Sequence, residues 1–302
     1  MDQRTIVSKA DLAVADLVST GGYLQLDQVQ TFMRMVQNEP TILKQARRVD
    51  MKSHTREVNK IGFGSRILHA APSEGQYLDA AKRGKPTTGQ IMLTTSKMMA
   101  EVHMTYESLE DNIERGNLNQ VIMEEMAKQV AIDLEEIFLL GDTTSSDPDL
   151  ALMDGILKKA SNHIVDAGSA SISKDVFLAG IKAMPHKYLR VRPNFRFWLS
   201  HNKEADYINT LANRIGDKAD ARVEGYTNSY AYGVPVEPAA MIPDAQCLFT
   251  HPQNLLWGVW RDIMVETDKD IRNQTYIIVL TLRAGIQIEE ADAVVKITNL
   301  AA

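Results

Sequence analysis

The sequence predicts an α+β protein, because helical and strand-like patterns occupy separate stretches of its 302 residues. Residues 118–140 carry apolar side chains every three or four positions, which is the spacing of an amphipathic helix. Residues 55–98 carry them at alternate positions, as strands do, around a turn-rich middle. With 44% hydrophobic and 24% charged residues, the composition is that of a folded globular protein.

The charge and the cysteine content exclude several classes of function. The 33 basic residues are outnumbered by 39 acidic ones, and the net charge of -6 argues against a surface that wraps nucleic acid. Cys247 is the only cysteine, which excludes an intrachain disulfide, a thiolate metal site and a paired-thiol redox centre. The first residues lack a signal-peptide core, and no window approaches the roughly 18 apolar residues of a membrane span. We therefore expect a soluble protein, intracellular when synthesised, with no membrane partner.

The common enzyme motifs are absent from the sequence. Gly62 and Gly64 begin a dinucleotide-loop pattern, but Ile67 stands where its third glycine belongs. Gly84-Lys85 is followed by Pro86 in place of the hydroxyl residue of a phosphate loop. The seven histidines form no i, i+4 pair, and no Gly-x-Ser-x-Gly elbow occurs. We predict no catalytic residue, no cofactor and no metal site.

The first segment, residues 1–54, is predicted to be an arm rather than a domain. It begins with short amphipathic helices that Pro40 interrupts, and Ile42 and Leu43 restart a turn of helix. Too few apolar positions are present to close a core. Its first fifty residues carry six basic and six acidic side chains, so the arm is not expected to trap a polyanion.

Residues 55–98 are predicted to form a long β-hairpin. Val58, Ile61 and Phe63 lie in one strand-like run, and a second run begins at Ile91. Strands of roughly 12 to 15 residues would extend about 40 to 50 Å at some 3.4 Å per residue. Because an isolated two-stranded ribbon is marginal in water, we expect this one to lie on another subunit.

The predicted hairpin is basic. Residues 55–97 carry seven basic and three acidic side chains, a net charge of +4 in a chain of net -6. A solvated loop that happens to be basic explains this charge equally well. A nucleic-acid finger is less favoured, because Tyr77 is the only aromatic residue in the turn region on which a base could stack.

The helix predicted at residues 118–140 follows. Asn117 is a suitable N-cap with Gln120 three residues later, and Gly141 is a suitable stop. Its polar face, extended to Asp142, carries six acidic side chains against one lysine, a net charge of -5. Such a face is usually only solvated, but a basic hairpin from one subunit lying across it would pair the two charges. The inter-subunit contact candidates are Arg66, Lys82, Arg83, Lys85, Glu124, Glu125, Glu135 and Glu136.

The order of motifs along nearly the whole chain resembles the major capsid protein of tailed bacteriophages, whose fold is shared with encapsulins and herpesvirus capsid floors. After the basic loop and residues 105–111, the motifs are Phe138-Leu139-Leu140-Gly141-Asp142, Met153-Asp154-Gly155-Ile156-Leu157, Phe197-Trp198-Leu199-Ser200, Tyr232-Gly233-Val234-Pro235-Val236, Met241-Ile242-Pro243 and Leu255-Leu256-Trp257-Gly258 leading to Arg261-Asp262. Each motif is weak alone, and their order and spacing carry the resemblance.

The resemblance implies an N-terminal arm, an extended loop, a peripheral domain built on the long spine helix and a sheet, and an axial domain at the centre of pentamers and hexamers. It places the peripheral domain at 99–150, the axial domain at 151–248 and a return to the peripheral domain at 249–302. Within these segments we expect helices at 173–184 and 202–215, an axial loop at 217–232, and strands at 257–265, 275–282 and 294–297.

The implied function is assembly of an icosahedral head, in the virion and built in the host cytoplasm, that encloses double-stranded DNA without specific binding. Scaffolding, portal and decoration proteins are the implied partners. The chain runs from Met1 almost directly into the arm, so scaffolding is expected to be a separate protein or not needed. Some members of the family form a crosslink between a loop lysine and an asparagine of another subunit. Lys82 or Lys85 could be the lysine, but no acceptor is identified, and we predict no crosslink.

Two alternatives remain open from the sequence. An encapsulin-type nanocompartment has the same fold but holds a cargo enzyme instead of DNA. A soluble enzyme with a long dimerisation hairpin, using His69 or His103, is the less favoured alternative.

Overall fold

The computed structural model describes residues 41–301 except 64–65, 72, 74–75, 108–117 and 213–228. The helices predicted before residue 41, the N-cap Asn117 and most of the predicted axial loop lie outside these residues. The chain divides into two compact units. In the described chain, the first comprises 41–45, Lys97–Ile137 and Arg261–Arg283, and the second comprises Ala46–Ser96, Phe138–Trp260 and Ala284–Ala302.

These units divide the chain differently from the five predicted segments. Helix α5 (Leu118–Leu140) and strands β10 (Leu255–Asp270) and β11 (Thr275–Ile288) each contribute residues to both units. The two long strands lie at the centre of a four-stranded sheet of order β1-β10-β11-β4. Its edges are β4 (Ser96–Thr105) and β1 (Arg47–Asp50), which pairs parallel to β10.

Helix α5 has the bounds that its apolar spacing predicts. Met126, Val130, Leu134 and Phe138 are buried along one stripe, at the spacing of four residues that places side chains on one face. Ala127 and Ala131 are also buried beside this stripe, where their small side chains permit close packing. The short helix α3 (Thr41–Gln45) buries Ile42 and Leu43, the two residues from which a turn of helix was predicted.

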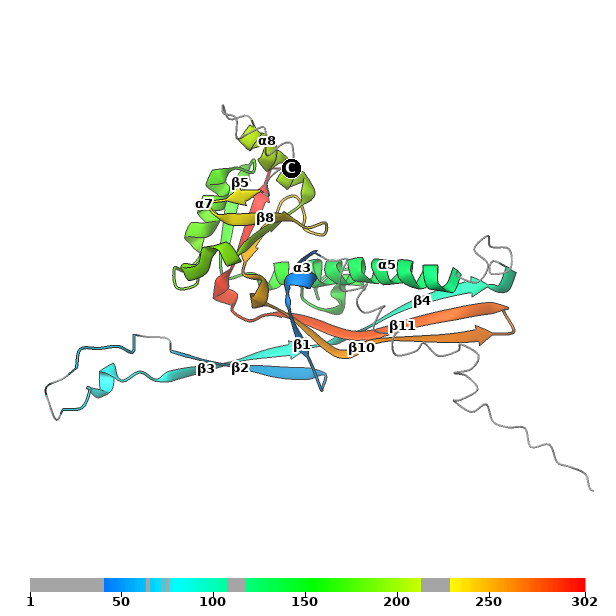
Figure 1. Ribbon diagram of the computed structural model, residues 1–302, viewed down its shortest axis with the longest axis horizontal. Coiled ribbons are helices and arrows are strands. Elements are labelled where there is room, and N and C mark those ends of the chain that lie inside the picture. The colour runs from blue at the N-terminus through cyan, green and yellow to red at the C-terminus, as the bar shows by residue number, and fades with distance from the viewer. Residues whose placement is uncertain are drawn as a thin grey trace, which may run out of the picture. The chain divides into compact units, whose positions relative to one another are not determined.

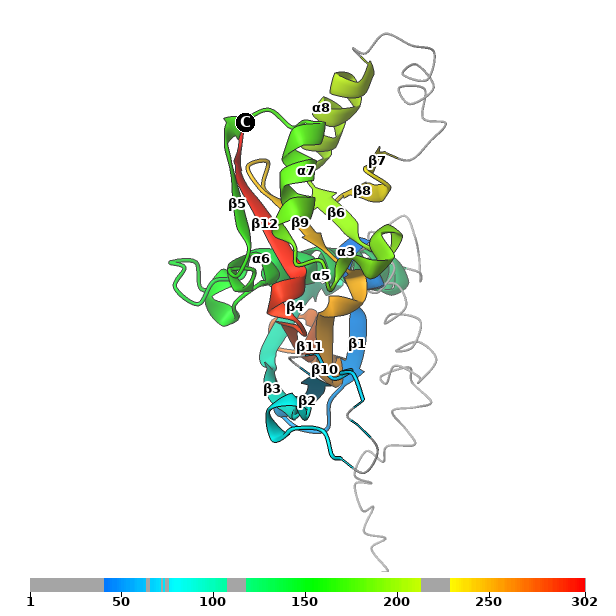
Figure 2. The ribbon, with the colours of Figure 1, turned by 90° about the vertical axis from the view of Figure 1, so that its left-hand side faces the viewer.

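A six-stranded mixed sheet, entirely in the second unit, has the order β5-β12-β9-β6-β8-β7. Its strands are β5 (Ile164–Ala170), β6 (Arg196–Leu199), β7 (Tyr230–Ala231), β8 (Val234–Pro238), β9 (Cys247–Thr250) and β12 (Val294–Leu300). Helix α7 (Lys174–Ala183) lies across the sheet beside β12 and β9 (Figure 2). The second long helix of this part is α8 (His201–Ala212). Both helices begin within one residue of their predicted positions.

The position of β12 differs from the one predicted for residues 249–302. That segment was expected to return to the peripheral domain, but β12 pairs antiparallel with β9 and parallel with β5, inside the sheet of the second unit. Residues of the predicted axial segment therefore have this strand as their neighbour.

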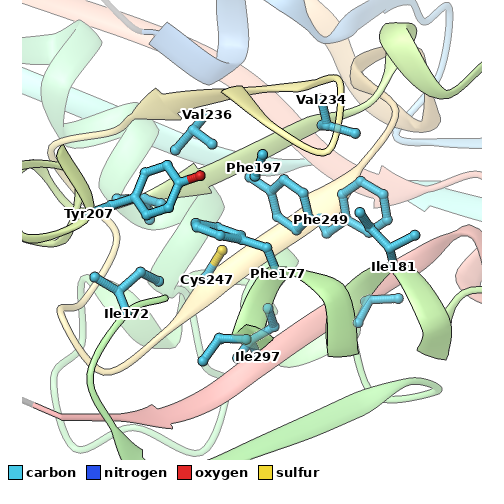
Figure 3. Packing of buried hydrophobic residues seen from close by; sticks show 14 of the residues in the cluster. Ile172, Phe177, Ile181, Phe197, Tyr207, Val234, Val236, Cys247, Phe249 and Ile297 are labelled. Atoms are coloured by element: carbon cyan, nitrogen blue, oxygen red, sulfur yellow. The ribbon is translucent and has the colours of Figure 1, made fainter. Parts of the chain in front are cut away.

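The core of this sheet is aromatic (Figure 3). The ring of Phe197 on β6 stacks on Phe249 of β9, with centroids 4.3 Å apart, and meets the edge of Phe177 from α7 at 4.7 Å. All three side chains are fully buried. Cys247 lies among them, and its burial raises the pKa of the thiol, so it behaves as a small apolar side chain.

Short helices connect these elements. They are α6 (Ile156–Lys159) and the 3₁₀ turns η1 (Ala80–Lys82), η2 (Leu150–Leu152), η3 (Leu189–Asn194) and η4 (Pro252–Asn254), with a further turn, η5 (Ala291–Ala293), before β12. Within the described chain, no helix combines the length and the apolarity needed to span a bilayer. The structure combines helices with sheets, in agreement with the predicted α+β class.

Candidate inter-subunit contact surfaces

The predicted hairpin is present in the second unit as strands β2 (Thr55–Phe63) and β3 (Pro86–Thr94) (Figure 1). They pair antiparallel without a bulge, from Thr55 opposite Thr94 to Phe63 opposite Pro86. Nine residues span about 30 Å at 3.4 Å per residue, shorter than the predicted 40 to 50 Å. The difference arises because the paired strands end at Phe63 and Pro86, after nine residues each instead of the predicted 12 to 15.

The two faces of this ribbon have different environments. Leu93 is fully buried and Ile91 partly buried on one face. Ile61, Phe63 and Met92 lie on the other face, with 75%, 54% and 59% of their surfaces exposed. In the described chain nothing covers this second face. Large exposed apolar side chains that share one face mark a contact surface.

The root of the hairpin is fixed to strands of its own unit. Thr95 N–H donates to the carbonyl of His54 at 3.1 Å, which closes the ribbon where the two strands part. The amide of Gln287 on β11 donates from Nε2 to the carbonyl of Met92 at 3.3 Å. The ammonium of Lys60 pairs with the carboxylate of Glu290 at 3.2 Å. A fixed root holds the exposed face in one orientation, which reduces the entropy lost when a partner binds.

Two close approaches reinforce this root. A Cβ on Gly285 would collide with the carbonyl oxygen of Thr94. A Cβ on Gly258 would lie 2.6 Å from Cδ2 of Leu93 and 2.7 Å from the sulfur of Met51. Both sites require glycine because the hairpin packs directly on the backbone of β10 and β11.

The four basic candidates lie between strands β2 and β3, in the segment that connects them. Arg66, Lys82 and Lys85 are exposed. Arg83 is exposed too, but its Nε donates to the carbonyl of Leu78 at 2.9 Å. The carboxylate of Asp79 accepts from the N–H of Ala81 at 3.3 Å and caps η1, which gives the loop a local structure.

The four acidic candidates lie on α5 in the first unit and differ among themselves. Glu125 is exposed and its carboxylate pairs with Lys128 at 2.8 Å. Glu124 and Glu136 are partly buried. Glu135 is only 5% exposed, and its Oε1 accepts a hydrogen bond of 2.9 Å from the N–H of Ile42. Glu135 therefore satisfies a free backbone donor at the start of α3.

The basic candidates thus belong to the second unit and the acidic candidates to the first. Whether they meet between subunits stays a prediction. The sequence interpretation, which relied on charge, missed the apolar face. The spacing of two between Ile61 and Phe63 indicates this face in the sequence. Val58 was placed in the same run, but its position puts it on the opposite face of the ribbon.

Titratable groups elsewhere form structural rather than reactive arrangements. Lys158 pairs with Asp142 at 2.6 Å and with Asp154 at 2.7 Å. Hydrogen bonds from Lys158 are the main reason that the pKa of each carboxyl falls to about 2, and both groups also accept bonds from Thr143 or Thr144. Among the described residues, no three His, Cys, Asp or Glu side chains converge as metal ligands.

Comparison with known proteins gives a consistent result for this chain. The sequence profile of the phage capsid family matches residues 21–299. The putative prophage capsid protein YqbE of Bacillus subtilis strain 168 is 40% identical over 312 residues, which cover 99% of each chain.

Solved structures share the fold at low sequence identity. The procapsid of satellite phage P4 with its size determination (Sid) protein aligns with a TM-score of 0.69 at 14% identity, covering 95% of each chain. The capsid of a native GTA particle aligns with a TM-score of 0.64 at 16% identity, covering 86% of this chain and 89% of that one. These alignments confirm the capsid fold that the order of motifs predicted.

Proposed function

The chain belongs to the phage capsid family, and from this premise we propose that it builds an icosahedral phage head from pentamers and hexamers of itself. Its role is that of a structural capsid protein located in the virion shell. The observation that supports self-assembly best is the uncovered apolar face of the hairpin, held on a fixed root. A surface of this kind needs a partner, and identical copies are the partners that a shell supplies.

The hairpin of one copy is proposed to lie on the peripheral domain of the next. Ile61, Phe63 and Met92 supply the apolar contact, and the surrounding cations meet the acidic face of α5. Glu124, Glu125 and Glu136 are the proposed carboxylates there, and Glu135 is left out because its Oε1 already accepts a hydrogen bond from Ile42 within its own chain. Apolar burial supplies the affinity in this arrangement, and the charges supply orientation.

Several finer features are proposed with it. The shell encloses double-stranded DNA without specific contacts and is assembled in the host cytoplasm. Scaffolding, portal and decoration proteins join it, and the assignment of peripheral and axial domains follows the predicted segments with β12 added to the axial sheet. The chain has no catalytic activity. The prophage name of the 40% identical relative supports a phage head over a cargo-filled nanocompartment.

Electron microscopy of the purified protein tests this function. We expect closed icosahedral shells, formed by the chain alone or with a scaffolding protein. Packaged DNA or tail proteins in the particles support the phage head, and a co-purifying cargo peptide would favour the nanocompartment. A protein that stays a monodisperse monomer under both conditions would contradict the proposal.

A double variant tests the hairpin contact separately. Ile61→Asp with Phe63→Asp is expected to abolish shells and to leave the unfolding midpoint unchanged, because both side chains are exposed in the single chain. Ala179→Asp, at an exposed position of α7, is the control and should still assemble. Shells formed normally by the double variant would show that the hairpin face does not make the contact.

A further inference from the structure

The second unit carries a small basic patch whose arginines form no ion pair with any described residue. We define it as Arg190, Val191 and Arg192 on η3, all of them exposed, with Val191 at 55%. The helical turn breaks at Val191, where φ is -123° and ψ is 70°. From residue 176 to residue 202 the sequence contains no aspartate or glutamate, so the patch has no acidic neighbour along the chain.

Two other cations in this stretch, Arg196 and Lys187, already have partners. Arg196 pairs with Glu237 at 2.9 Å. Lys187 lies over the ring of Tyr188 at 4.5 Å. In the described part of the chain, Arg190 and Arg192 make no ion pair. Two exposed arginines that flank an exposed apolar residue in the sequence suit a protein surface that offers carboxylates around an apolar residue.

The same unit carries an acidic patch of that composition in the loop between α5 and α6. Residues 141–157 include four aspartates and no lysine or arginine. Asp142 and Asp154 both form ion pairs with Lys158. Asp147 and Asp149 remain exposed, and Leu152 beside them is 38% exposed. We define Asp147, Asp149 and Leu152 as the acidic patch.

The two patches lie on different sides of the unit. In Figure 2 the loop that leads into α6 projects to the left, and the segment that leads into β6 projects to the right. Complementary surfaces on different sides of one molecule cannot satisfy each other within it. They join copies head to tail, and a head-to-tail contact forms a ring when the rotation closes.

We propose that the basic patch of one copy docks on the acidic patch of the next copy around a capsomer. Arg190 and Arg192 pair with Asp147 and Asp149 around a contact between Val191 and Leu152. This inference rests on the proposed function and names a contact that the hairpin does not make. A second copy fits the patch better than DNA, because the matching acidic surface is present on the same chain and two arginines give only weak phosphate binding.

Charge reversal tests the pairing, with the wild type assembled in parallel. Arg190→Glu with Arg192→Glu, and separately Asp147→Lys with Asp149→Lys, are each expected to lower the yield of closed shells at least tenfold. The variant with all four changes restores the pairing with its sign inverted and should recover shells. Lys174→Glu with Asp175→Lys, exposed on α7, is the control, and circular dichroism verifies that each variant folds.

Mixing the two reversed variants in equal amounts gives a sharper result. Each variant can pair only with the other, so every contact is satisfied in a ring with alternating members. Six-membered rings close in this way, whereas a five-membered ring retains at least one mismatched contact. We therefore expect hexameric rings without closed shells in the mixture.

The outcomes separate this contact from the proposed function. If either reversed variant forms normal shells, or if the fourfold variant does not recover them, the proposed contact is wrong. The proposed function is unaffected by these results as long as the wild type forms shells. Shells from the arginine variant that retain less DNA would show that the patch faces the genome, which also overturns the contact. A wild type that forms no shells contradicts the proposed function itself.

Discussion

Gly285 shows how a single residue sets the position of the hairpin. No side chain fits there, because the carbonyl oxygen of Thr94 occupies the space of a Cβ and belongs to backbone that cannot rotate away. Gly89, within β3, contrasts with it, since a Cβ there would meet only the Cβ of Lys60 at 4.0 Å.

Gly285→Ala is therefore expected to lower the free energy of unfolding by about 3 kcal/mol, at the upper end of overpacking costs. Gly89→Ala should change it by no more than about 0.5 kcal/mol. Denaturant unfolding of both variants checks this prediction. Equal midpoints would mean that the backbone of β11 moves freely away from the hairpin.

Glu135 is expected to stabilise the chain rather than the contact between chains. Glu135→Ala leaves the N–H of Ile42 buried without an acceptor and should cost about 1 to 3 kcal/mol of unfolding free energy. Glu135→Gln keeps an acceptor oxygen and should cost less. Glu125→Ala, at an exposed site, is the control in thermal unfolding. Equal losses for the alanine and glutamine variants at residue 135 would argue against the hydrogen bond.

Lys158 is expected to give the protein an acid-sensitive contribution to stability. The pKa of Asp142 and of Asp154 is lowered to about 2 in the fold, so their pairing with Lys158 stabilises the protein above the ordinary carboxyl pKa of 3.8. This contribution to the free energy of unfolding is lost as the pH falls from about 4 to about 2.

Comparison of the wild type with Lys158→Met measures this contribution. The difference in unfolding free energy should be constant between pH 5 and pH 8 and shrink as the pH falls toward 2. Denaturant titrations at several pH values provide the measurement. A difference that is independent of pH down to 2 would show that the pairing adds nothing.

At the scale of elements, β3 presents adjacent residues to different partners. Leu93 is fully buried against Gly258, whereas Met92 faces outward. Leu93→Ala should cost about 2 to 5 kcal/mol of unfolding free energy, and Met92→Ala should cost almost none. Met92→Ala should instead lower the yield of shells. Calorimetry and electron microscopy of the two variants distinguish these effects, and a reversed order would exclude the assigned faces.

Elements with a strong local pattern could be predicted from the sequence, and those fixed by distant partners could not. Helix α5 has its predicted bounds because its apolar stripe runs unbroken over six turns. Strand β1 was missed, since Arg47–Asp50 contains one apolar residue and is a strand only through its pairing with β10. The exposed face of the hairpin was visible in Ile61 and Phe63, but no sequence pattern shows which face remains uncovered.

At the scale of the whole molecule, charge is segregated although the total is modest. The net charge of -6 makes copies repel, while the +4 hairpin and the acidic helix make particular surfaces attract. Added salt screens both effects, because the Debye length falls from about 10 Å at 0.1 M to about 3 Å at 1 M. Once two copies are close, the short-range attraction between oppositely charged surfaces outweighs the repulsion between their net charges.

We therefore expect the initial rate of shell formation to fall as sodium chloride rises from about 0.1 M to 0.5 M. Light scattering of the assembling protein measures this rate. The fourfold charge-inverted variant should show the same dependence, since its pairs have the same number and strength. A rate that rises steadily with salt would mean that repulsion between whole chains controls assembly.

The position of β12 inside the six-stranded sheet also governs the order in which this protein can fold during synthesis. Ile164 of β5 pairs with Lys296, so the ribosome adds about 130 residues after β5 before its partner exists. At roughly 5 to 20 residues per second this takes on the order of ten seconds. Throughout that time the sheet is incomplete and β5 is an unpaired edge. A nascent chain is thus unable to present its finished assembly surfaces to completed copies until translation has nearly ended.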